Sequence, residues 1–520
     1  MAKGTTLGSP SKEAAQATAH EPAAVFGSPA AGWLSLLQHT TKSRFCKLAL
    51  ISSILFALLC KWAVGLNGYS GKGIEPMHGD FEAQRHWLEI TLHLPTAYWY
   101  KYDLQYWGLD YPPLTAYHSW LLGWIAHRIH PEWVALFTSR GYESTALQVF
   151  MRATALATEC AIYLPAIIVG IKSVWAKGRS GLEQQLLVLA VLLQPALILV
   201  DHGHFQYNSA MLGFVAWTAA LVGFDQNVLA AITFCCALFF KQMSLYYALP
   251  VFFYLLGRCI KGPNGLLTFV SLGATVVCCF GVLLVPFLGS VESLLQVFRR
   301  VFPVERGLYE DKVANVWCSL SVLVKLRNLF EVQQLVYLSA ALTLLAVLPS
   351  GINLLLKPSP KRLLYGLLNG SLGFFLCSFM VHEKSILLPL LPATILLLDE
   401  PVVGVWFNNV AMFSMFPLLK KDGLVMPYIL AVVLWNWLFS FGWKRASGLV
   451  KLAKAISYAV IFGLHAMEAV VPPPPRYPDI YVVLNVLFST SMFVVFFGYY
   501  NYRQILSGAL DRDSRKQKAA

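Results

Sequence analysis

Four short polar segments in this largely apolar sequence carry the residue types that could do chemistry. The first is the run 79–87, Gly-Asp-Phe-Glu-Ala-Gln-Arg-His-Trp, which places Asp80 and Glu82 close to Arg85 just after an apolar block at 45–66. A carboxylate that is partly removed from water at a membrane edge can have a raised pKa and act as a general base toward a hydroxyl group. The alternative interpretation is a solvated loop with local ion pairs.

Aromatic residues crowd the region around the first segment, together with a further carboxylate, Asp110. The flat faces of such rings suit sugar rings, but Trp and Tyr also gather in belts at membrane–water interfaces. Both interpretations stay open for this set: Trp87, Trp99, Tyr100, Tyr106, Trp107 and Tyr111.

The second segment is 201–208, Asp-His-Gly-His-Phe-Gln-Tyr-Asn, directly after an apolar block. Its His-x-His pair beside a carboxylate is compatible with metal ligation, but a site needs a third or fourth ligand that this segment does not supply. A polar shelf that contacts a phosphate or a sugar is the favoured interpretation. The residues concerned are Asp201, His202, His204 and Gln206.

The third and fourth segments are 299–312 and 382–384. The third contains four basic residues, including Arg306, and arginine presents a planar fork that suits phosphate oxygens; the alternative is pairing with the acids of the same loop. The fourth, His382-Glu383-Lys384, lies at the junction of two apolar blocks, where ionisable residues are either functional or simply interfacial.

The elements that must position these segments are membrane-spanning helices. Of the 520 residues, 57% are hydrophobic and 13% are charged, about half of the ~25% that is typical of a soluble protein. The net charge of +13 is spread over short loops, which is the pattern of positive-inside bias and does not favour nucleic-acid binding. The cysteines show no metal-ligand spacing.

We expect an all-α polytopic membrane protein with about fourteen transmembrane helices, because the apolar residues fall in blocks near the length that crosses a bilayer. After the first block they lie at about 148–171, 184–200, 207–224, 226–240, 243–258, 264–288, 332–350, 361–381, 384–398, 402–418, 425–442, 450–471 and 479–500. Basic residues in alternate loops predict that both termini are cytosolic, with Lys420 and Lys421 as the main exception. A span at 113–130 would invert every later loop, so we interpret this segment as an amphipathic helix in the interface; that it dips into the bilayer is the alternative.

The predicted organisation has five parts. A disordered cytosolic tail, 1–43, precedes an N-terminal transmembrane catalytic module, 44–288, which includes a long non-cytosolic loop, 67–147. A second non-cytosolic loop covers 289–331, a C-terminal transmembrane module covers 332–502, and 503–520 is a cytosolic tail. Long loops among short connections are where function is expected.

Several of these motifs resemble one enzyme family. GDFEAQRHW, LQYWGLDYPPLTAYHS, SRGYES, DHGHFQYN, VFPVERGLYEDKVANVW and VHEKSILLPLLP are similar to segments of the dolichyl-phosphate-glucose-dependent α-1,3-glucosyltransferases of the endoplasmic reticulum. The resemblance covers about 44–400. The run 82–87 and the intact 106–110 favour the branch that adds the first glucose to the lipid-linked oligosaccharide over the sibling branch that adds the second.

The resemblance implies a GT-C glycosyltransferase fold with a lumenal active site in the endoplasmic reticulum membrane. The implied donor is β-linked dolichyl-phosphate-glucose, and the implied acceptor is the terminal mannose of the nine-mannose oligosaccharide on dolichyl pyrophosphate, with inversion at the anomeric centre. Asp80 matches the family's catalytic base. Arg306, His382 and Lys384 are candidates to hold the donor phosphate. The remaining candidates for substrate binding are Glu82, Arg85, Trp107, Asp110, Tyr111, Asp201, His202, His204 and Gln206.

No cofactor is implied, and no metal either, because no DxD triplet occurs at Asp80. Two alternatives from other classes remain. A secondary transporter would place ionisable residues near the bilayer midplane and often shows inverted repeats, whereas here they fall at block ends and no repeat is visible. A non-catalytic scaffold would not need so many ionisable residues at one membrane face.

Overall fold

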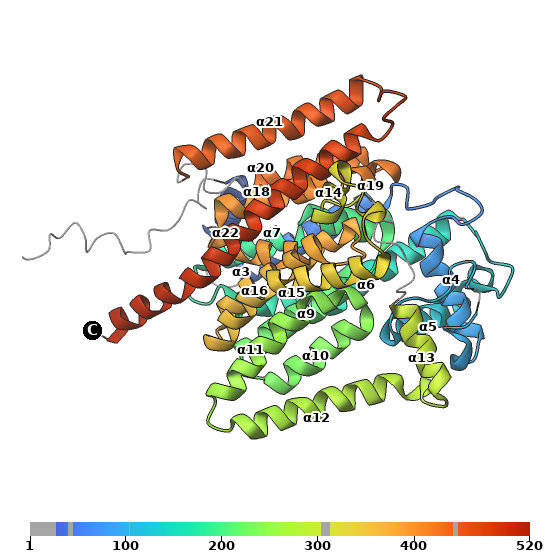
Figure 1. Ribbon diagram of the computed structural model, residues 1–520, viewed down its shortest axis with the longest axis horizontal. Coiled ribbons are helices and arrows are strands. Elements are labelled where there is room, and N and C mark those ends of the chain that lie inside the picture. Colours follow the sequence, from blue (N-terminus) through green and yellow to red (C-terminus); the bar gives the residue numbers. More distant parts are fainter. Residues whose placement is uncertain (1–27, 40–44, 103, 303–311, 440–445, 520) are drawn as a thin grey trace, which may run out of the picture.

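The computed structural model describes residues 28–39, 45–102, 104–302, 312–439 and 446–519 (Figure 1). Within these ranges the regular secondary structure is entirely helical. The α-helices are α2 (Pro29–His39), α3 (Phe45–Gly65), α4 (Asp80–His93), α5 (Pro113–Ile129), α6 (Thr145–Gly170), α7 (Gly181–Leu192), α8 (Pro195–Leu197), α9 (Asn208–Gly223), α10 (Asn227–Phe240), α11 (Ala248–Lys261), α12 (Gly265–Leu284), α13 (Val291–Val301), α14 (Val316–Leu323), α15 (Val332–Leu356), α16 (Pro360–Cys377), α17 (Leu387–Ile395), α18 (Pro401–Ser414), α19 (Phe416–Lys421), α20 (Val425–Leu438), α21 (Gly448–Val470) and α22 (Ile480–Ala519).

Short helical turns of other types connect or extend these helices. Two are π-helical, η5 (Ile171–Trp175) and η6 (Ile198–Phe205). The 3-10 turns are η3 (Thr96–Tyr98), η4 (Pro131–Val134), η7 (Gln242–Tyr247), η8 (Val285–Phe287), η9 (Leu326–Asn328), η10 (Glu383–Ile386) and η11 (Leu396–Leu398).

The chain is a polytopic membrane protein. In the described residues eight helical stretches are long and apolar enough to cross a bilayer: Leu48–Gly65, Thr145–Trp175, Gly181–Phe205, Gln242–Lys261, Gly265–Phe287, Val332–Leu356, Gly448–Val470 and Ile480–Ser507. The shorter α9, α10 and α20 are also apolar. Several of the fourteen predicted spans are therefore shorter than a full crossing, and that count is not established.

One of the predicted apolar blocks shows why continuous apolar sequence does not give one straight helix. The block 184–200 divides into α7, α8 and the start of η6. Pro195 has no backbone N–H to donate, so it opens a new helical turn instead of continuing α7. Gln194 caps that turn by accepting the N–H of Leu197 at 2.7 Å.

Burial separates central helices from peripheral ones. The most apolar stretch of Gly181–Phe205 is completely buried, whereas the corresponding stretches of α12 and α21 are only 11% buried. In Figure 1 α12 follows the lower edge of the molecule and α21 the upper edge. Peripheral helices with apolar surfaces turned outward are what a bilayer requires.

Helices α4 and α5 pack against each other at the end of the molecule opposite the C-terminus, with α13 beside them (Figure 1). Helix α5 covers the predicted interfacial segment 113–130 and is not among the span-length helices. Its placement flat in the interface stays a prediction.

Two predicted tails contain helix. Residues 29–39, which the composition predicted to be disordered, form α2, because Ala30, Ala31 and Leu34 are buried against neighbouring helices. The contacts are with α3 and α7. At the other end α22 continues from its apolar part through the predicted tail 503–520 as far as Ala519.

Candidate active site

Asp80 is the first residue of α4, and the close approach of another loop fixes its position. A Cβ on the preceding Gly79 would lie 2.6 Å from the backbone of Ser70, so only glycine allows these two loop segments to approach each other so closely. The N–H of Asp80 donates to the Ser70 hydroxyl at 3.4 Å. A carboxylate in the first turn also interacts favourably with the helix dipole.

Three donors from distant parts of the chain converge on one oxygen of Asp80. Its Oδ2 lies 2.9 Å from Nε2 of His204 and 2.6 Å from Nζ of Lys384, and it also accepts a hydrogen bond from the Gln206 amide. Within the described residues Oδ1 has no such partner, and the side chain is 25% exposed. Oδ1 is therefore the oxygen that a substrate hydroxyl can reach.

The electrostatic state of Asp80 is opposite to the expectation from sequence. Burial raises the pKa of Asp80, but the charges and hydrogen bonds of Lys384 and His204 outweigh it and hold the pKa well below its usual range. The carboxylate is consequently ionised at neutral pH.

The π-helical turn η6 brings His204 and Gln206 to Asp80. Its geometry is held from inside by Asp201, whose carboxylate accepts the backbone N–H groups of Asn208 at 3.1 Å and Ser209 at 2.6 Å. His202, on the other side, lies 2.7 Å from Glu159 of α6 through Nε2. In this structure the hydrogen bonds of Asp201 and His202 thus go to the protein itself, and their assignment to substrate binding stays a prediction.

Gln206 is oriented by two further side chains. Its Oε1 accepts a hydrogen bond from Nζ of Lys241 at 3.1 Å and one from the Tyr111 hydroxyl at 3.3 Å. Because the carbonyl oxygen is engaged, the amide nitrogen has to face Asp80. Lys241 also lies over the Tyr111 ring, 4.8 Å from its centroid, a cation–π contact that ties the two together.

Asp422 is a site residue that the sequence reasoning missed. Its Oδ2 lies 2.5 Å from Nδ1 of His204, and its side chain is 4% exposed. It is the single carboxylate between Glu400 and Glu468. An isolated acid in so apolar a stretch was the available signal, although nothing in the sequence indicates that it meets a residue 218 positions away.

Glu82 and Arg85 form a buried ionic network on α4. The Arg85 guanidinium donates to Glu82 at 2.7 Å and to Glu89 at 2.9 Å, and it is fully buried. Burial raises the pKa of Glu89, yet the hydrogen bond from His86 and the charge of Arg85 lower it to about 2. The network stabilises the helix that presents Asp80, and a role in direct substrate contact stays a prediction.

The aromatic residues surround α4. The Tyr106 hydroxyl donates to Glu82 at 3.0 Å, and the indole N–H of Trp107 donates to the carbonyl of Met77 at 2.5 Å. The Tyr111 ring lies 4.8 Å from that of Trp87. The carbonyl of Asp110 accepts a hydrogen bond from Gln242 at 3.3 Å. Trp107, Asp110 and Tyr111 are partly exposed, and their assignment to substrate binding stays a prediction.

Of the three residues predicted to hold a phosphate, Lys384 is the one that the structure places on Asp80. His382 is partly exposed and precedes Lys384 by two positions at the start of η10. Arg306 lies outside the described residues. Among the side chains that the structure describes, no group of three or more His, Cys, Asp or Glu has an arrangement that could hold a metal ion.

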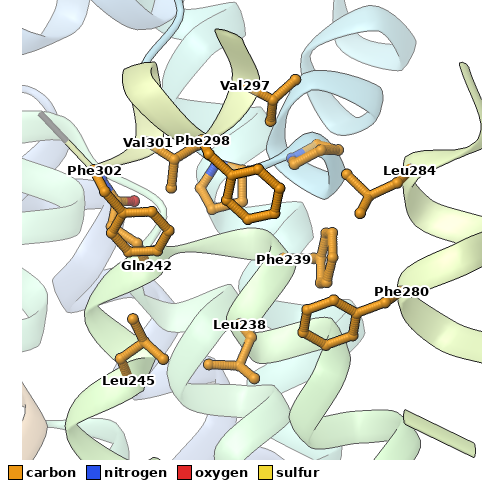
Figure 2. Close-up of a pocket in the computed structure, with 12 residues that line it drawn as sticks. Leu238, Phe239, Gln242, Leu245, Phe280, Leu284, Val297, Phe298, Val301 and Phe302 are labelled. Carbon is orange, nitrogen blue, oxygen red and sulfur yellow. The ribbon is translucent and has the colours of Figure 1, made fainter. Parts of the chain in front are cut away.

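An apolar groove lies between α13 and the helices α10 and α12 (Figure 2). Its volume is about 210 Å³. Figure 2 shows Val297, Phe298 and Val301 of α13 facing side chains of α10, η7 and α12 across it. The remaining lining residues are Pro112, Pro113, Leu238, Phe239, Gln242, Leu245, Phe280, Leu284 and Phe302. Gln242 of the groove follows Lys241 in the chain, and Lys241 contacts Gln206 of the cluster around Asp80.

Comparisons with known proteins agree on one family. A model described as the ALG6, ALG8 glycosyltransferase family matches residues 57–499. A Schizosaccharomyces pombe protein named probable dolichyl pyrophosphate Man9GlcNAc2 alpha-1,3-glucosyltransferase is 44% identical, covering 91% of this chain and 94% of its own length. Proteins of the same name, without "probable", are 42% identical in Gallus gallus (89% and 98% covered) and 41% identical in Saccharomyces cerevisiae (87% and 91% covered).

Proposed function

Because the chain belongs to the ALG6, ALG8 glycosyltransferase family, we propose that it transfers glucose from dolichyl-phosphate-glucose to the terminal mannose of Man9GlcNAc2 on dolichyl pyrophosphate. The linkage is α-1,3, and the reaction is the first glucosylation of the lipid-linked oligosaccharide used for protein N-glycosylation. The observation that carries this proposal is the ionised Asp80, with one oxygen held by three donors and the other open.

The reaction is a single displacement. Oδ1 of Asp80 accepts the proton of the mannose 3-hydroxyl while the oxygen of this hydroxyl attacks the anomeric carbon of glucose. The bond from this carbon to the phosphate oxygen breaks, and dolichyl phosphate leaves with the electron pair. A β-linked donor then yields an α-linked product by inversion.

The leaving group needs stabilised negative charge more than it needs a proton, since a phosphate monoester is already a weak base. Lys384 supports this role because its ammonium group lies beside Asp80, where donor and acceptor must meet. His382, two positions earlier, and Arg306 complete the proposed phosphate contacts. Neither a cofactor nor a metal ion has a part in this scheme.

The groove under α13 suits the lipid of the donor. Its lining is apolar except for Gln242, which is next in the chain to Lys241, a partner of Gln206 in the Asp80 cluster. A polyprenyl chain held there would present its phosphate to Lys384. This arrangement explains why the enzyme is built from apolar helices, because both substrates carry membrane-bound tails.

The topology that fits this chemistry has the α4–α5 end in the lumen of the endoplasmic reticulum and both termini in the cytosol. The C-terminus of α22 lies at the end of the molecule opposite α4 (Figure 1), which supports this topology. The family resemblance implies the GT-C fold, and we retain about fourteen crossings as the proposed count, with the shorter apolar helices included.

The test is transfer by the purified protein from synthetic dolichyl-phosphate-glucose to two acceptors, the nine-mannose form and its monoglucosylated derivative. We expect transfer to the nine-mannose acceptor, and loss of it in Asp80→Asn. Asp225→Asn is the matched control, because this aspartate side chain is 72% exposed and paired at the surface with Arg258. Transfer to the monoglucosylated acceptor alone would assign the protein to the sibling reaction, the adding of the second glucose.

A further inference from the structure

Asp422 lies in a turn between α19 and α20 that is fitted closely to η6. A Cβ on Gly203 would lie 2.8 Å from a methyl carbon of Leu424, so the two segments touch directly beside His204. Gly423 completes the turn with a φ of +72°, which favours glycine. The register between η6 and this turn sets the distance from Asp422 to His204.

The turn itself does not depend on the Asp422 carboxylate. Backbone hydrogen bonds from Gly423 to Lys420 at 3.1 Å and from Leu424 to Leu419 at 2.8 Å close it. Within the described part of the chain, the Asp422 side chain has His204 as its hydrogen-bond partner. Removing the carboxylate charge therefore changes the surroundings of the imidazole and leaves the turn in place.

The imidazole of His204 has a carboxylate oxygen at each nitrogen. Nδ1 faces Asp422 at 2.5 Å and Nε2 faces Asp80 at 2.9 Å. A neutral ring carries one N–H, which leaves a lone pair directed at one carboxylate. Only the doubly protonated ring donates to both, and its positive charge is then shared by two acids.

We propose that Asp422 is a positioning residue for glucosyl transfer. It fixes the His204 ring and stabilises its protonated form, so that Nε2–H is donated to Oδ2 of Asp80 and the open Oδ1 faces the acceptor hydroxyl. This inference rests on the proposed function and deepens it, because it makes the state of the base depend on a residue that does not touch the substrate.

The charged groups facing His204 are Asp80, Asp422 and Lys384, whose Nζ lies 3.2 Å from Nε2. Lys384 opposes protonation of the ring, and the two carboxylates favour it. When Asp422 loses its charge, this balance shifts toward the neutral ring as pH rises. The donated hydrogen bond to Asp80 is then lost at a lower pH than in the wild type.

The experiment compares Asp422→Asn with the exposed-site control Asp225→Asn in the glucosyl-transfer assay from pH 5.5 to 8.5. We expect a kcat at pH 7.5 that is lower by about 10-fold or more, as is usual for residues that orient an active-site group. The donor KM should change by less than about 2-fold, and the fall in activity with rising pH should begin earlier than in the wild type. Asp422→Glu, which restores the charge, should recover part of the loss.

A double-mutant cycle with His204→Gln tests the route of the effect. If Asp422 acts through the imidazole, the double variant His204→Gln/Asp422→Asn should be no slower than His204→Gln alone. A further loss equal to the single effect of Asp422→Asn would overturn the proposal, as would an Asp422→Asn variant with the rate and pH profile of Asp225→Asn. Failure of Asp422→Asn to fold where Asp225→Asn folds would assign the residue a structural role instead. Lack of transfer by the wild type would refute the proposed function and is a distinct result.

Discussion

The contact between Lys384 and Asp80 makes a quantitative prediction about the pH dependence of the reaction. At the observed 2.6 Å and an effective dielectric constant of about 20, Coulomb's law gives about 6 kcal/mol of attraction. When Lys384 is changed to Met, water restores part of the lost electrostatic stabilisation of the carboxylate. An opposite charge at hydrogen-bond distance typically lowers a carboxyl pKa by about 1–3 units. Lys384→Met should therefore raise the pKa of Asp80 by about that amount.

The sign follows from the state that reacts. In the proposed mechanism the ionised Asp80 is the base, and its pKa lies well below the usual range in the wild type. Activity of the wild type should hence not fall through protonation of Asp80 until the pH is below about 4, the ordinary aspartate value. In Lys384→Met the acid limb should move upward by about 1–3 pH units.

The assay is the pH profile of glucosyl transfer, normalised for each variant to its own maximum. Lys384→Met also loses a proposed phosphate contact, so its maximal rate falls, but this loss does not alter the normalised limb. Lys357→Met, an exposed lysine between α15 and α16, is the matched control and should retain the wild-type profile. A Lys384→Met limb that superimposes on the wild type would refute the argument that this lysine sets the pKa of Asp80.

Five further changes have defined outcomes. Asp80→Asn should reduce kcat by about 100-fold or more with folded protein retained, and a smaller loss would contradict its role as base. Arg85→Met leaves two carboxylates buried without their cation and should cost about 3–5 kcal/mol of folding stability in thermal or denaturant unfolding. Acidification tests the same network. Because the pKa of Glu89 is about 2 in the folded protein and 4.5 in its ordinary state, Glu89 contributes about 3 kcal/mol to the free energy of unfolding. This contribution is complete above about pH 4.5 and should be lost as the pH falls toward 2. Phe298→Asn in the groove should raise the KM of a long-chain donor more than that of a short-chain donor, whereas Phe462→Asn on the outward face of α21 should change neither. Chelator should leave transfer unchanged, and loss of activity that added metal restores would require a metal in the scheme.

The sequence was sufficient to nominate most of the cluster around Asp80. His204, Gln206 and Lys384 were singled out because each lies at the end of an apolar block, and the structure brings all three to Oδ2 of Asp80. A block end marks a membrane edge, so polar residues at several such ends on one side are expected to be near one another. The spacing in sequence carries no such information, since 304 positions separate Asp80 from Lys384.

Three features could not be predicted because they depend on tertiary contacts. Asp422 has no motif around it and becomes recognisable only when its turn packs beside Gly203. The pKa of Asp80 was predicted to be raised and is lowered, because the expectation counted desolvation and not the neighbouring charges of Lys384 and His204. The helix α2 likewise follows from packing that composition does not encode.

The charges of the cluster also constrain the order of events. With His204 protonated, the charges of Asp80 and Asp422 balance those of His204 and Lys384 before the donor binds. The donor adds a phosphodiester of charge −1, and the cation proposed to bind it is Lys384, which is already held by Asp80. As the reaction proceeds, Asp80 becomes neutral by taking the acceptor proton, and the leaving phosphate monoester approaches a charge of −2.

Negative charge therefore moves from Asp80 to the phosphate in the transition state, and a Lys384 placed between them can follow it. Lys384 stabilises the transition state more than the ground state only if its ammonium group moves from Oδ2 toward the phosphate as the phosphate charge grows. Donor binding that begins this shift raises the pKa of Asp80 and makes it a stronger base when the acceptor arrives. We expect the acid limb of kcat, which reports the substrate complex, to lie at higher pH than the acid limb of kcat/KM, which reports the free enzyme. Coincident limbs would mean that Lys384 stays with Asp80 throughout, and the phosphate would then depend on His382 and Arg306.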